Sequence, residues 1–379
     1  MSSGLYIHIP YCLKKCPYCD FNSYATSREE VKLNEQSYVN ALIKESKHSN
    51  WQEDINTIFI GGGTPSMLSG KSIEDLLCGL SKNLKINKDV EITLESNPGS
   101  ISEPLYVDKI KSFRKSGINR ISLGIQSFNN KKLKFLGRIH NSEQSLKAIN
   151  NVISAGFENF NLDLIYAVKD ETLSSWKKDL EQAINLKPNH ISAYTLTIEP
   201  GTDFGKESKK GLIHTSDEGI TAELYKYTQT ELINNTYEQY EVSNFSKPNF
   251  ECRHNLSYWS YNNYLGLGAG AHSFKNNQRW INILKPQDYI KRIEEKNTAI
   301  QRHEELSETQ AQIEIIYTCL RKSNGLDLTK IKLNKELQSE INDFIEQKML
   351  KKDDNRIRYT KKGYLFSDYI VKRLSLAIA

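Results

Sequence analysis

The chain has 379 residues, of which 38% are hydrophobic, and a formal net charge of +5. This length predicts one large domain with a smaller one, and so modest a charge does not argue for a nucleic-acid or membrane-surface partner. No apolar run approaches the length of a membrane span. Only four residues precede the first predicted strand, so we expect no signal peptide and a cytoplasmic protein. Six cysteines in a chain this long do not indicate a disulfide framework.

Six apolar, β-rich runs alternate with amphipathic helical patterns over residues 1–205. We expect strands at Leu5–Ile9, Thr57–Ile60, Glu91–Glu95, Arg120–Gln126, Asn161–Ala167 and His190–Thr197. We expect helices at Glu35–Ser46, Ser72–Leu84, Pro104–Ser116, Ser142–Ala155 and Leu173–Asn185. Repeated strand–helix units predict a parallel sheet with right-handed crossovers. The predicted fold is therefore α/β, an open and partial (βα)6 TIM-like barrel.

Two smaller regions follow the predicted barrel. Residues 206–300 are expected to form an irregular α+β extension, with a helix at Ser216–Leu232 and strands at Tyr240–Phe245 and Arg279–Asn282. Residues 301–379 show helical patterns at Glu308–Lys322 and Leu337–Gln347, a turn at 352–355 between short strands, and a last helix at Gly363–Leu374. This order resembles a winged helix. Its hairpin is basic but lacks an aromatic stacking pattern, so a solvated or protein-docking face is favoured over a nucleic-acid interface.

Three cysteines, Cys12, Cys16 and Cys19, stand in a CxxxCxxC spacing directly after the first predicted strand. Prolines flank and interrupt this segment, which keeps it out of regular helix and lets three thiolates turn toward one place. A structural zinc site takes four protein ligands, whereas three thiolates leave one iron of a cubane cluster free. Zinc with His8 as the fourth ligand is the alternative. Tyr18 can shield such a site from water.

Polar groups also follow the other predicted strands. They are Gly61-Gly62-Gly63-Thr64-Pro65, Glu95-Ser96-Asn97-Pro98, Gln126, Asp163 with Tyr166, and Tyr194 with Thr197. In α/β barrels the functional groups lie at the carboxyl ends of the strands, so we expect all of these around one site. A triple glycine lets the backbone approach a ligand, although a tight turn would also explain it.

Arg138 and Asp163 are the charged candidates of this site. A fixed guanidinium at Arg138 suits a carboxylate; a solvated charge at a helix end is the alternative. Asp163 lies in an apolar strand, where an unpaired carboxylate is costly. We therefore expect Asp163 to face the mouth of the barrel and to accept hydroxyl hydrogen bonds, such as those of a ribose.

CxxxCxxC with an aromatic residue before the last cysteine resembles the signature of the radical S-adenosylmethionine (SAM) superfamily. In that superfamily the free iron chelates SAM, and an electron from the cluster cleaves SAM to a 5′-deoxyadenosyl radical. The motifs YIHIPYCLKKCPYCDFNS, GGGTPS, LESNP, GIQSF, NLDLIY and CRHNLSYW narrow the resemblance to its coproporphyrinogen dehydrogenase branch, and there to the HemW heme-chaperone family. The oxidising enzymes of this branch carry a fourth cysteine where this chain has Phe21, and a long N-terminal arm that we do not expect here.

The resemblance implies roles for individual residues. Cys12, Cys16 and Cys19 would hold a [4Fe-4S] cluster. A first SAM site would be lined by Tyr6, Gly62, Gly63, Thr64 and Glu95. Positions that bind a second SAM in the oxidising relatives are Gln126, Arg138, Asp163 and Thr197. The segment Tyr166-Ala167-Val168-Lys169 departs from the Tyr-Gly-Leu-Pro usual in the branch, beside this site.

The HNLSYW run is implied to bind heme, with His254 as the iron ligand and Tyr258 and Trp259 on the porphyrin face. Neutral imidazole is the commonest metal ligand, but a locally packed loop in which His254 caps a backbone carbonyl is the alternative. The implied function is a heme chaperone that passes heme to an unidentified heme-accepting protein, including a membrane protein met transiently. An electron donor such as a flavodoxin or ferredoxin would serve the cluster.

Two other functions are alternatives to the chaperone function. One is the oxygen-independent oxidation of coproporphyrinogen III by a deoxyadenosyl radical, which the absent fourth cysteine argues against, while SAM cleavage stays open. The other is nucleic-acid binding through the tail, which we do not expect.

Overall fold

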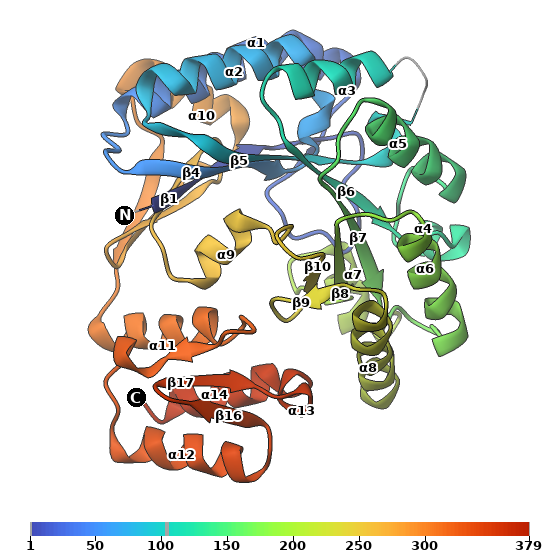
Figure 1. The fold of residues 1–379 in the computed structure, drawn as a ribbon. Coiled ribbons are helices and arrows are strands. Elements are labelled where there is room, and N and C mark those ends of the chain that lie inside the picture. Colours follow the sequence, from blue (N-terminus) through green and yellow to red (C-terminus); the bar gives the residue numbers. More distant parts are fainter. Residues whose placement is uncertain (1, 103–105, 379) are drawn as a thin grey trace.

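Six parallel strands form the centre of one twelve-stranded sheet and follow one another in chain order. The computed structural model describes residues 2–102 and 106–378. The central strands are β1 (Ser2–Ile9), β4 (Asp54–Gly62), β5 (Ile86–Ser96), β6 (Arg120–Gln126), β7 (Phe160–Tyr166) and β8 (His190–Thr195). They curve into an open arc (Figure 1), in which β1 and β8 pair with other strands rather than with each other. The predicted α/β fold with a partial barrel is confirmed.

Helices cover the convex side of this arc (Figure 1). They are α1 (Arg28–His48), α2 (Gly70–Asn83), α3 (Tyr106–Lys115), α4 (Asn130–Phe135), α5 (Ser142–Ser154) and α6 (Leu173–Asn185). Helix α1 begins at Arg28 rather than at the predicted Glu35, because Ser27 and Glu30 form a capping box ahead of the apolar pattern. The start of the predicted helix Pro104–Ser116 lies outside the described residues.

The region after the barrel extends the same sheet at both edges. At one edge β11 (Tyr264–Leu267) runs parallel to β1 and continues through β12 (His272–Lys275), β13 (Gln278–Asn282) and β14 (Ile300–Glu305). At the other edge β8 pairs with β10 (Asn244–Ser246), which pairs with β9 (Glu238–Gln239). The predicted single strand Tyr240–Phe245 is wrong, because the chain turns between β9 and β10.

The helices of this region are α7 (Asp203–Lys209), α8 (Glu218–Asn234), α9 (Arg253–Trp259) and α10 (Pro286–Lys296). Helix α9 contains the HNLSYW run and lies on the concave side of the sheet, apart from the helices that cover the outside (Figure 1). Two short strands, β2 (Tyr11–Cys12) and β3 (Tyr24–Ala25), pair with each other in the cysteine segment.

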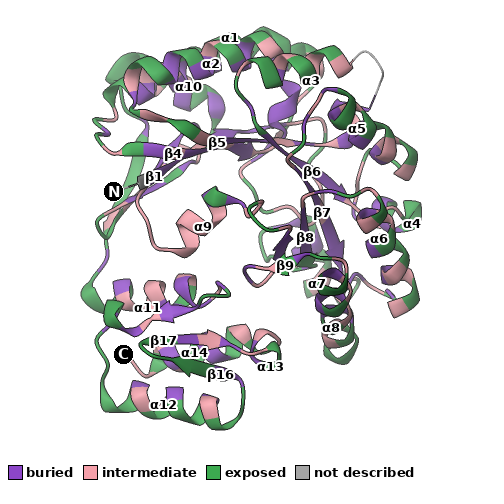
Figure 2. Ribbon diagram, in the orientation of Figure 1, coloured by how far each residue is buried: buried purple, intermediate pink, exposed green. Residues whose placement is uncertain are grey.

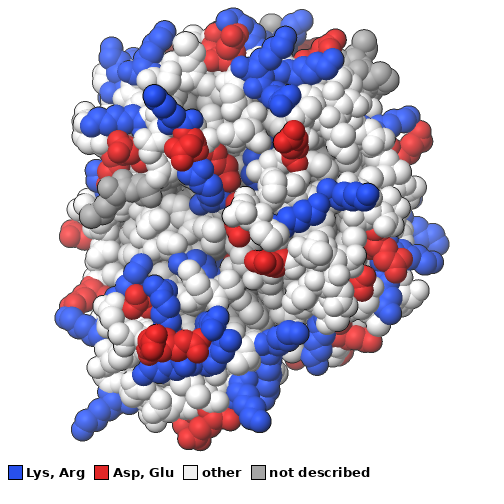
Figure 3. Space-filling view, in the orientation of Figure 1, with Lys and Arg blue, Asp and Glu red and all other residues white. Residues whose placement is uncertain are grey.

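The tail has its own hydrophobic core and a three-stranded sheet. Its elements are α11 (Glu308–Cys319), β15 (Leu326–Asp327), α12 (Lys335–Glu346), β16 (Leu350–Asp353), β17 (Arg356–Tyr359), α13 (Lys361–Tyr364) and α14 (Ser367–Leu376). This is the helix, helix, hairpin and helix order predicted. The hairpin arginines Arg356 and Arg358 pair with Asp327 and Asp353, and Figure 3 shows both signs of charge mixed over the face in view.

The strands of the arc are its most buried parts, and exposure is concentrated on the outer helices (Figure 2). Among the described residues, no helix is long and apolar enough to cross a membrane.

Buried Glu45 ties α1 to three places in the region after the barrel: the residue that follows β11, the end of β13, and α10. Its carboxylate accepts hydrogen bonds from the Gly268 backbone N–H (2.9 Å), the Asn282 amide (2.6 Å) and the Tyr289 hydroxyl (2.6 Å). Burial raises the pKa of Glu45 to about 7 from its ordinary 4.5. The folded protein thus holds this proton more tightly than the unfolded chain does. The resulting stabilisation is fully present below pH 4.5 and is lost as the pH rises through 7.

Glu45→Gln cannot ionise and tests this linkage. Between pH 4.5 and pH 8 the free energy of unfolding of the wild type should fall by up to about 3 kcal/mol relative to that of the variant. Urea denaturation at a series of pH values measures the difference. Exposed Glu74→Gln is the control and should follow the wild type, and identical pH profiles for wild type and Glu45→Gln would contradict the prediction.

Candidate functional site: a cavity inside the open barrel

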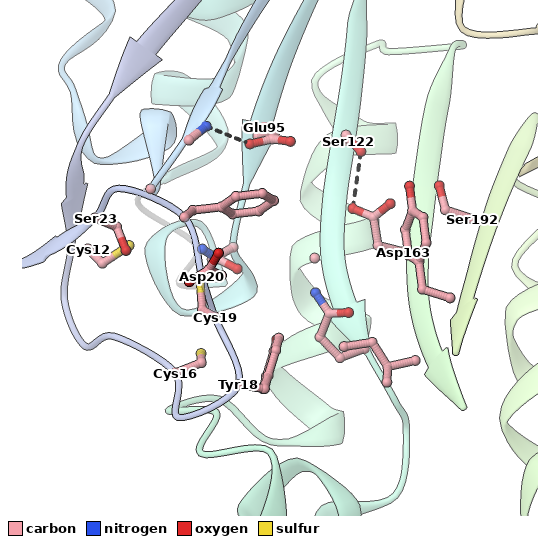
Figure 4. A pocket seen from close by; sticks show the side chains of 18 of the residues that line it. Cys12, Cys16, Tyr18, Cys19, Asp20, Ser23, Glu95, Ser122, Asp163 and Ser192 are labelled. Atoms are coloured by element: carbon pink, nitrogen blue, oxygen red, sulfur yellow. Dashed lines mark hydrogen bonds between the residues drawn. The ribbon is translucent and has the colours of Figure 1, made fainter. Parts of the chain in front are cut away.

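A cavity of about 390 Å³ lies within the arc of the six strands (Figure 4). It is lined by all three cysteines of the CxxxCxxC segment. The other predicted site residues that line it are Tyr18, Gly62, Gly63, Glu95, Gln126, Arg138, Asp163 and Thr197. Segments far apart in the sequence therefore meet at one place, because the parallel strands all end at the same edge of the sheet.

The cysteine segment is held in place by backbone contacts to several neighbours. The N–H groups of Gly63 and Thr64 donate to the carbonyls of Ile9 (2.8 Å) and Tyr11 (2.7 Å). A side chain at Gly63 would meet the Tyr11 oxygen at 2.6 Å, so glycine is required at this close approach. On the far side, the Phe204 N–H donates to the Pro17 carbonyl at 2.9 Å. The segment is thus fixed between β4 and α7.

The three thiols face the cavity from one side (Figure 4). Among the described residues, no three His, Cys, Asp or Glu side chains gather closely enough to hold a single metal ion. A cubane cluster instead bonds each thiolate at a different corner, so separated thiols that line one cavity fit it. Burial raises the pKa of Cys12 and Cys19, and deprotonation would accompany metal binding.

His8, the fourth ligand of the zinc alternative, does not face this cavity. Its ring nitrogens bond to the Tyr6 hydroxyl (2.9 Å) and to the Asn22 carbonyl (2.7 Å). Tyr6 also lies outside the cavity lining, although we expected it in the first SAM site. Its hydroxyl orients His8 instead.

The glycine run approaches the cavity as expected. The Gly62 N–H donates to the Glu95 carboxylate at 3.0 Å, and burial, with a smaller contribution from Asp163, raises the pKa of Glu95 to about 8. Gly62 has φ +106°, and an added Cβ would lie 2.5 Å from the His8 ring. Thr64 is buried behind the cysteines, where its hydroxyl donates to Cys12 Sγ at 3.5 Å.

Arg138 lies directly beside the cysteines. Its guanidinium donates to Cys16 Sγ (3.4 Å), to the Gly124 carbonyl (2.9 Å) and to the Asn97 side chain. Burial raises the pKa of the neighbouring Tyr18 phenol, while the Arg138 charge opposes that shift. Arg138 therefore places a positive charge within 3.4 Å of one of the three cysteine sulfurs.

Asp163 stands across the cavity from the cysteines (Figure 4). It accepts hydrogen bonds from the Ser122 hydroxyl (3.2 Å) and the Asn161 amide (2.7 Å). Burial raises its pKa despite these bonds. Asp163 therefore belongs to a hydrogen-bonded polar wall, which sequence reasoning did not assemble.

The HNLSYW helix does not present His254 to the cavity. His254 is 1% exposed, stacks on Phe59, and its two ring nitrogens bond to the hydroxyls of Thr57 (2.8 Å) and Tyr258 (3.0 Å). Burial lowers the pKa of His254 to about 3, so its ring is neutral. Both ring nitrogens of His254 are therefore engaged in internal hydrogen bonds. Trp259 is likewise covered, by the Arg321 guanidinium at 4.6 Å.

Similarity to known proteins decides the family. A family model described as the radical SAM superfamily matches residues 6–183. Heme chaperone HemW of Lactococcus lactis subsp. lactis (strain IL1403) is 36% identical over 99% of this chain and 97% of its own length. Heme chaperone HemW of Escherichia coli (strain K12) is 43% identical over 71% of this chain and 69% of its own length. The chain belongs to the HemW heme-chaperone family.

This chain shares its fold with a solved enzyme structure. Coproporphyrinogen III oxidase (HemN) from Escherichia coli, described as a radical SAM enzyme, matches with a TM-score of 0.81 over 99% of this chain and 89% of that chain. The two are 23% identical, so this match establishes the fold alone. Phe21, which stands where the oxidising enzymes are expected to have a cysteine, lines the cavity and is 64% exposed.

A buried ion cluster supports the segment that carries Gln126 and Arg138. Lys132 of α4 donates to Glu171 (2.5 Å) and Asp179 (3.3 Å), and all three side chains are buried. Asp179 also accepts the Ser127 hydroxyl (2.5 Å) and the Phe128 N–H (2.8 Å). This cluster therefore fixes the turn that follows β6.

Lys132→Met would leave two buried carboxylates without their cation. We expect it to lower the free energy of unfolding by about 3–5 kcal/mol, the usual effect of breaking a buried ion pair. Chemical denaturation measures it. Lys71→Met removes only exposed pairs with Glu74 and Asp75, which water screens, and should change the free energy of unfolding far less. Equal effects of the two changes would contradict the assigned role.

Gly62→Ala tests the close approach of the glycine run. Both Gly62 and Gly211 have positive φ, but a Cβ at Gly211 meets no atom within 4 Å. The left-handed conformation alone costs about 1–2 kcal/mol, so Gly211→Ala should show only that loss in denaturation. Gly62→Ala should lose more, since it also displaces His8, and a smaller loss than in Gly211→Ala would refute the packing described.

Proposed function

We propose that this protein is a heme chaperone that binds heme and transfers it to an acceptor protein, while carrying a [4Fe-4S] cluster and an exchangeable SAM. Membership of the HemW family, at 36% identity over almost the whole chain, is the observation that carries the proposal. The three thiols that line one cavity support the cofactor part.

In this proposal Cys12, Cys16 and Cys19 hold the cluster. When bound, a [4Fe-4S] cluster with an open iron supplies one-electron chemistry to SAM. Arg138 compensates the thiolate charge from its position 3.4 Å from Cys16 Sγ. Tyr18 limits the access of water, since it is half-buried in the same cavity wall.

The SAM site is proposed at the glycine run and Glu95. Gly62 and Gly63 line the cavity without side chains, so a ligand can approach the backbone closely, and Glu95 presents a carboxyl beside them. Gln126, Asp163 and Thr197 line the remaining wall, where the oxidising relatives are expected to hold a second SAM. The hydrogen bonds of Asp163 to Ser122 and Asn161 suit recognition of ligand hydroxyls.

The heme site is proposed at α9, with His254 as the iron ligand and Tyr258 beside it. His254 becomes available only when its bond to Thr57 or Tyr258 breaks, so heme binding requires α9 to shift. Its neutral ring is already in the protonation state that a metal needs. Heme uptake is therefore proposed to be coupled to opening of the concave side of the sheet.

The partners are proposed to be a heme-accepting protein, including a membrane protein met transiently, and an electron donor of the flavodoxin or ferredoxin kind. Lys14 and Lys15 are exposed within the cysteine segment. These cations suit an acidic donor surface, since complementary charge steers association.

Heme titration of the purified protein tests the proposal. We expect a saturable absorbance band at one heme per chain, which weakens in His254→Ala because the iron ligand is lost. His140→Ala removes another buried histidine, hydrogen-bonded to the Ile125 carbonyl, and is the matched control.

Absence of a stoichiometric band in the wild type would overturn the chaperone proposal, and an unchanged band in His254→Ala would overturn the site. Conversion of coproporphyrinogen III to protoporphyrinogen with SAM and dithionite, without oxygen, would favour the alternative function of an oxidase.

A further inference from the structure

The cavity runs along the length of the strands and does not stop at their carboxyl ends. Arg120 and Gln126 are the first and last residues of β6, and both line it. At about 3.3 Å per residue they lie roughly 20 Å apart along the strand. Every second residue of β6 faces inward, so Ser122 and Gly124 complete the row between them. The site thus has a floor at the amino end, far from the cysteines.

Arg120 is an unpartnered cation at this floor. Its side chain is 2% exposed, yet its Nε finds no hydrogen-bond partner, and no bond from its terminal nitrogens is found within the part of the chain that the structure describes. A buried guanidinium without partners is costly. Because Arg120 lines the cavity, a ligand bound in the cavity can supply the hydrogen-bond acceptor that the protein does not.

The acidic neighbours of Arg120 do not supply that acceptor. Glu91 lies near enough to interact electrostatically with Arg120. However, the two carboxylate oxygens of Glu91 accept hydrogen bonds from the backbone N–H groups of Arg253 and His254, both at 3.1 Å. Asp163 is engaged by Ser122 and Asn161. These acids lower the net charge of the floor without occupying the donors of Arg120.

Helix α9 contributes the opposite side of the floor. Its Asn255 is the residue of the HNLSYW run that lines the cavity, whereas the neighbouring His254 points to Thr57. No hydrogen bond of the Asn255 side chain is found among the described residues. Ser192 of β8 also lines this part, across the cavity from the cysteines (Figure 4). The Ser192 hydroxyl already donates to the Asn161 side chain (3.2 Å), so the floor offers the donors of a planar guanidinium and an amide.

We propose that Arg120 and Asn255 form a binding subsite for a carboxylate group of a ligand that enters the barrel. The five N–H donors of a guanidinium match a carboxylate in bidentate geometry, and the amide of Asn255 adds a further donor. The identity of the ligand rests on the proposed function, in which the two sources are a heme propionate and the carboxylate of a second SAM bound at the wall of Gln126, Asp163 and Thr197.

Anaerobic binding titrations on the cluster-loaded protein test the subsite. The probes are SAM, heme and heme dimethyl ester, in which the propionates are blocked. Arg120→Gln should weaken binding of the recognised ligand at least tenfold. Asn255→Asp should also weaken binding of that ligand, because the new carboxylate repels the carboxylate of the ligand. If the ligand is heme, the ester should bind the wild type more weakly than heme and should not respond to Arg120→Gln.

Asn262→Asp makes the same charge change on a residue outside the cavity lining and should leave both affinities unchanged. A loss confined to SAM would assign the SAM carboxylate to Arg120, and a loss confined to heme would assign a propionate. Unchanged affinities for both ligands in Arg120→Gln and Asn255→Asp would overturn the subsite. If Arg120→Gln does not fold, Asn255→Asp alone decides. Failure of heme to bind the wild type would refute the chaperone function, while the SAM titrations would still test Arg120.

Discussion

The site depends on one constraint. Hydrogen bonds hold the cysteine segment in place across the carboxyl edge of the parallel sheet. Gly63 and Thr64 hold it from β4, and Phe204 holds it from α7. The Asn22 side chain donates to the carbonyls of Ala269, between β11 and β12, and Leu284, between β13 and α10. Because the segment is tied to parts of the chain that are far apart in sequence, the position of its thiols is set by the whole fold rather than by the local spacing.

The interior of the arc is polar where the core of a closed barrel is packed with branched apolar side chains. Inward positions of β6, β7 and β8 carry Ser122, Asp163 and Ser192, whereas outward positions such as Leu123 and Leu164 pack under the helices. The polar row leaves a cavity that runs from the cysteines to Arg120. Helix α9 is anchored to the same interior through Glu91 and Thr57, so the HNLSYW run and the cysteine segment belong to one site.

Much of the fold follows from periodicity and capping, but contacts between distant segments do not. The helix Leu173–Asn185 has the bounds predicted, since Thr172 caps it and its apolar positions recur regularly. The chain reversal between β9 and β10 was missed, because the apolar alternation there resembles one strand. Strand β14 was also missed: five of its six residues are exposed, so it lacks the apolar alternation that marks a strand.

The site was predicted best where one motif gathers several ligands. The cysteines and the glycine run line the cavity because their chemistry is local to single turns. The internal hydrogen bonds of His254 could not be predicted from the sequence, because its partners, Thr57 and Tyr258, include a residue almost two hundred positions away. Arg120 was predicted as the first residue of a strand but not as a residue of the site. The signal was present in its row with Ser122 and Gln126, which alternate along one face.

The spectrum of the reduced cluster tests the central claim, that three thiolates hold a cubane with an iron open to SAM. Anaerobic reconstitution should give four irons per chain, and the electron paramagnetic resonance signal should change when SAM is added. Cys16→Ser should lose the signal. One zinc per chain, or an iron signal indifferent to SAM, would contradict the account.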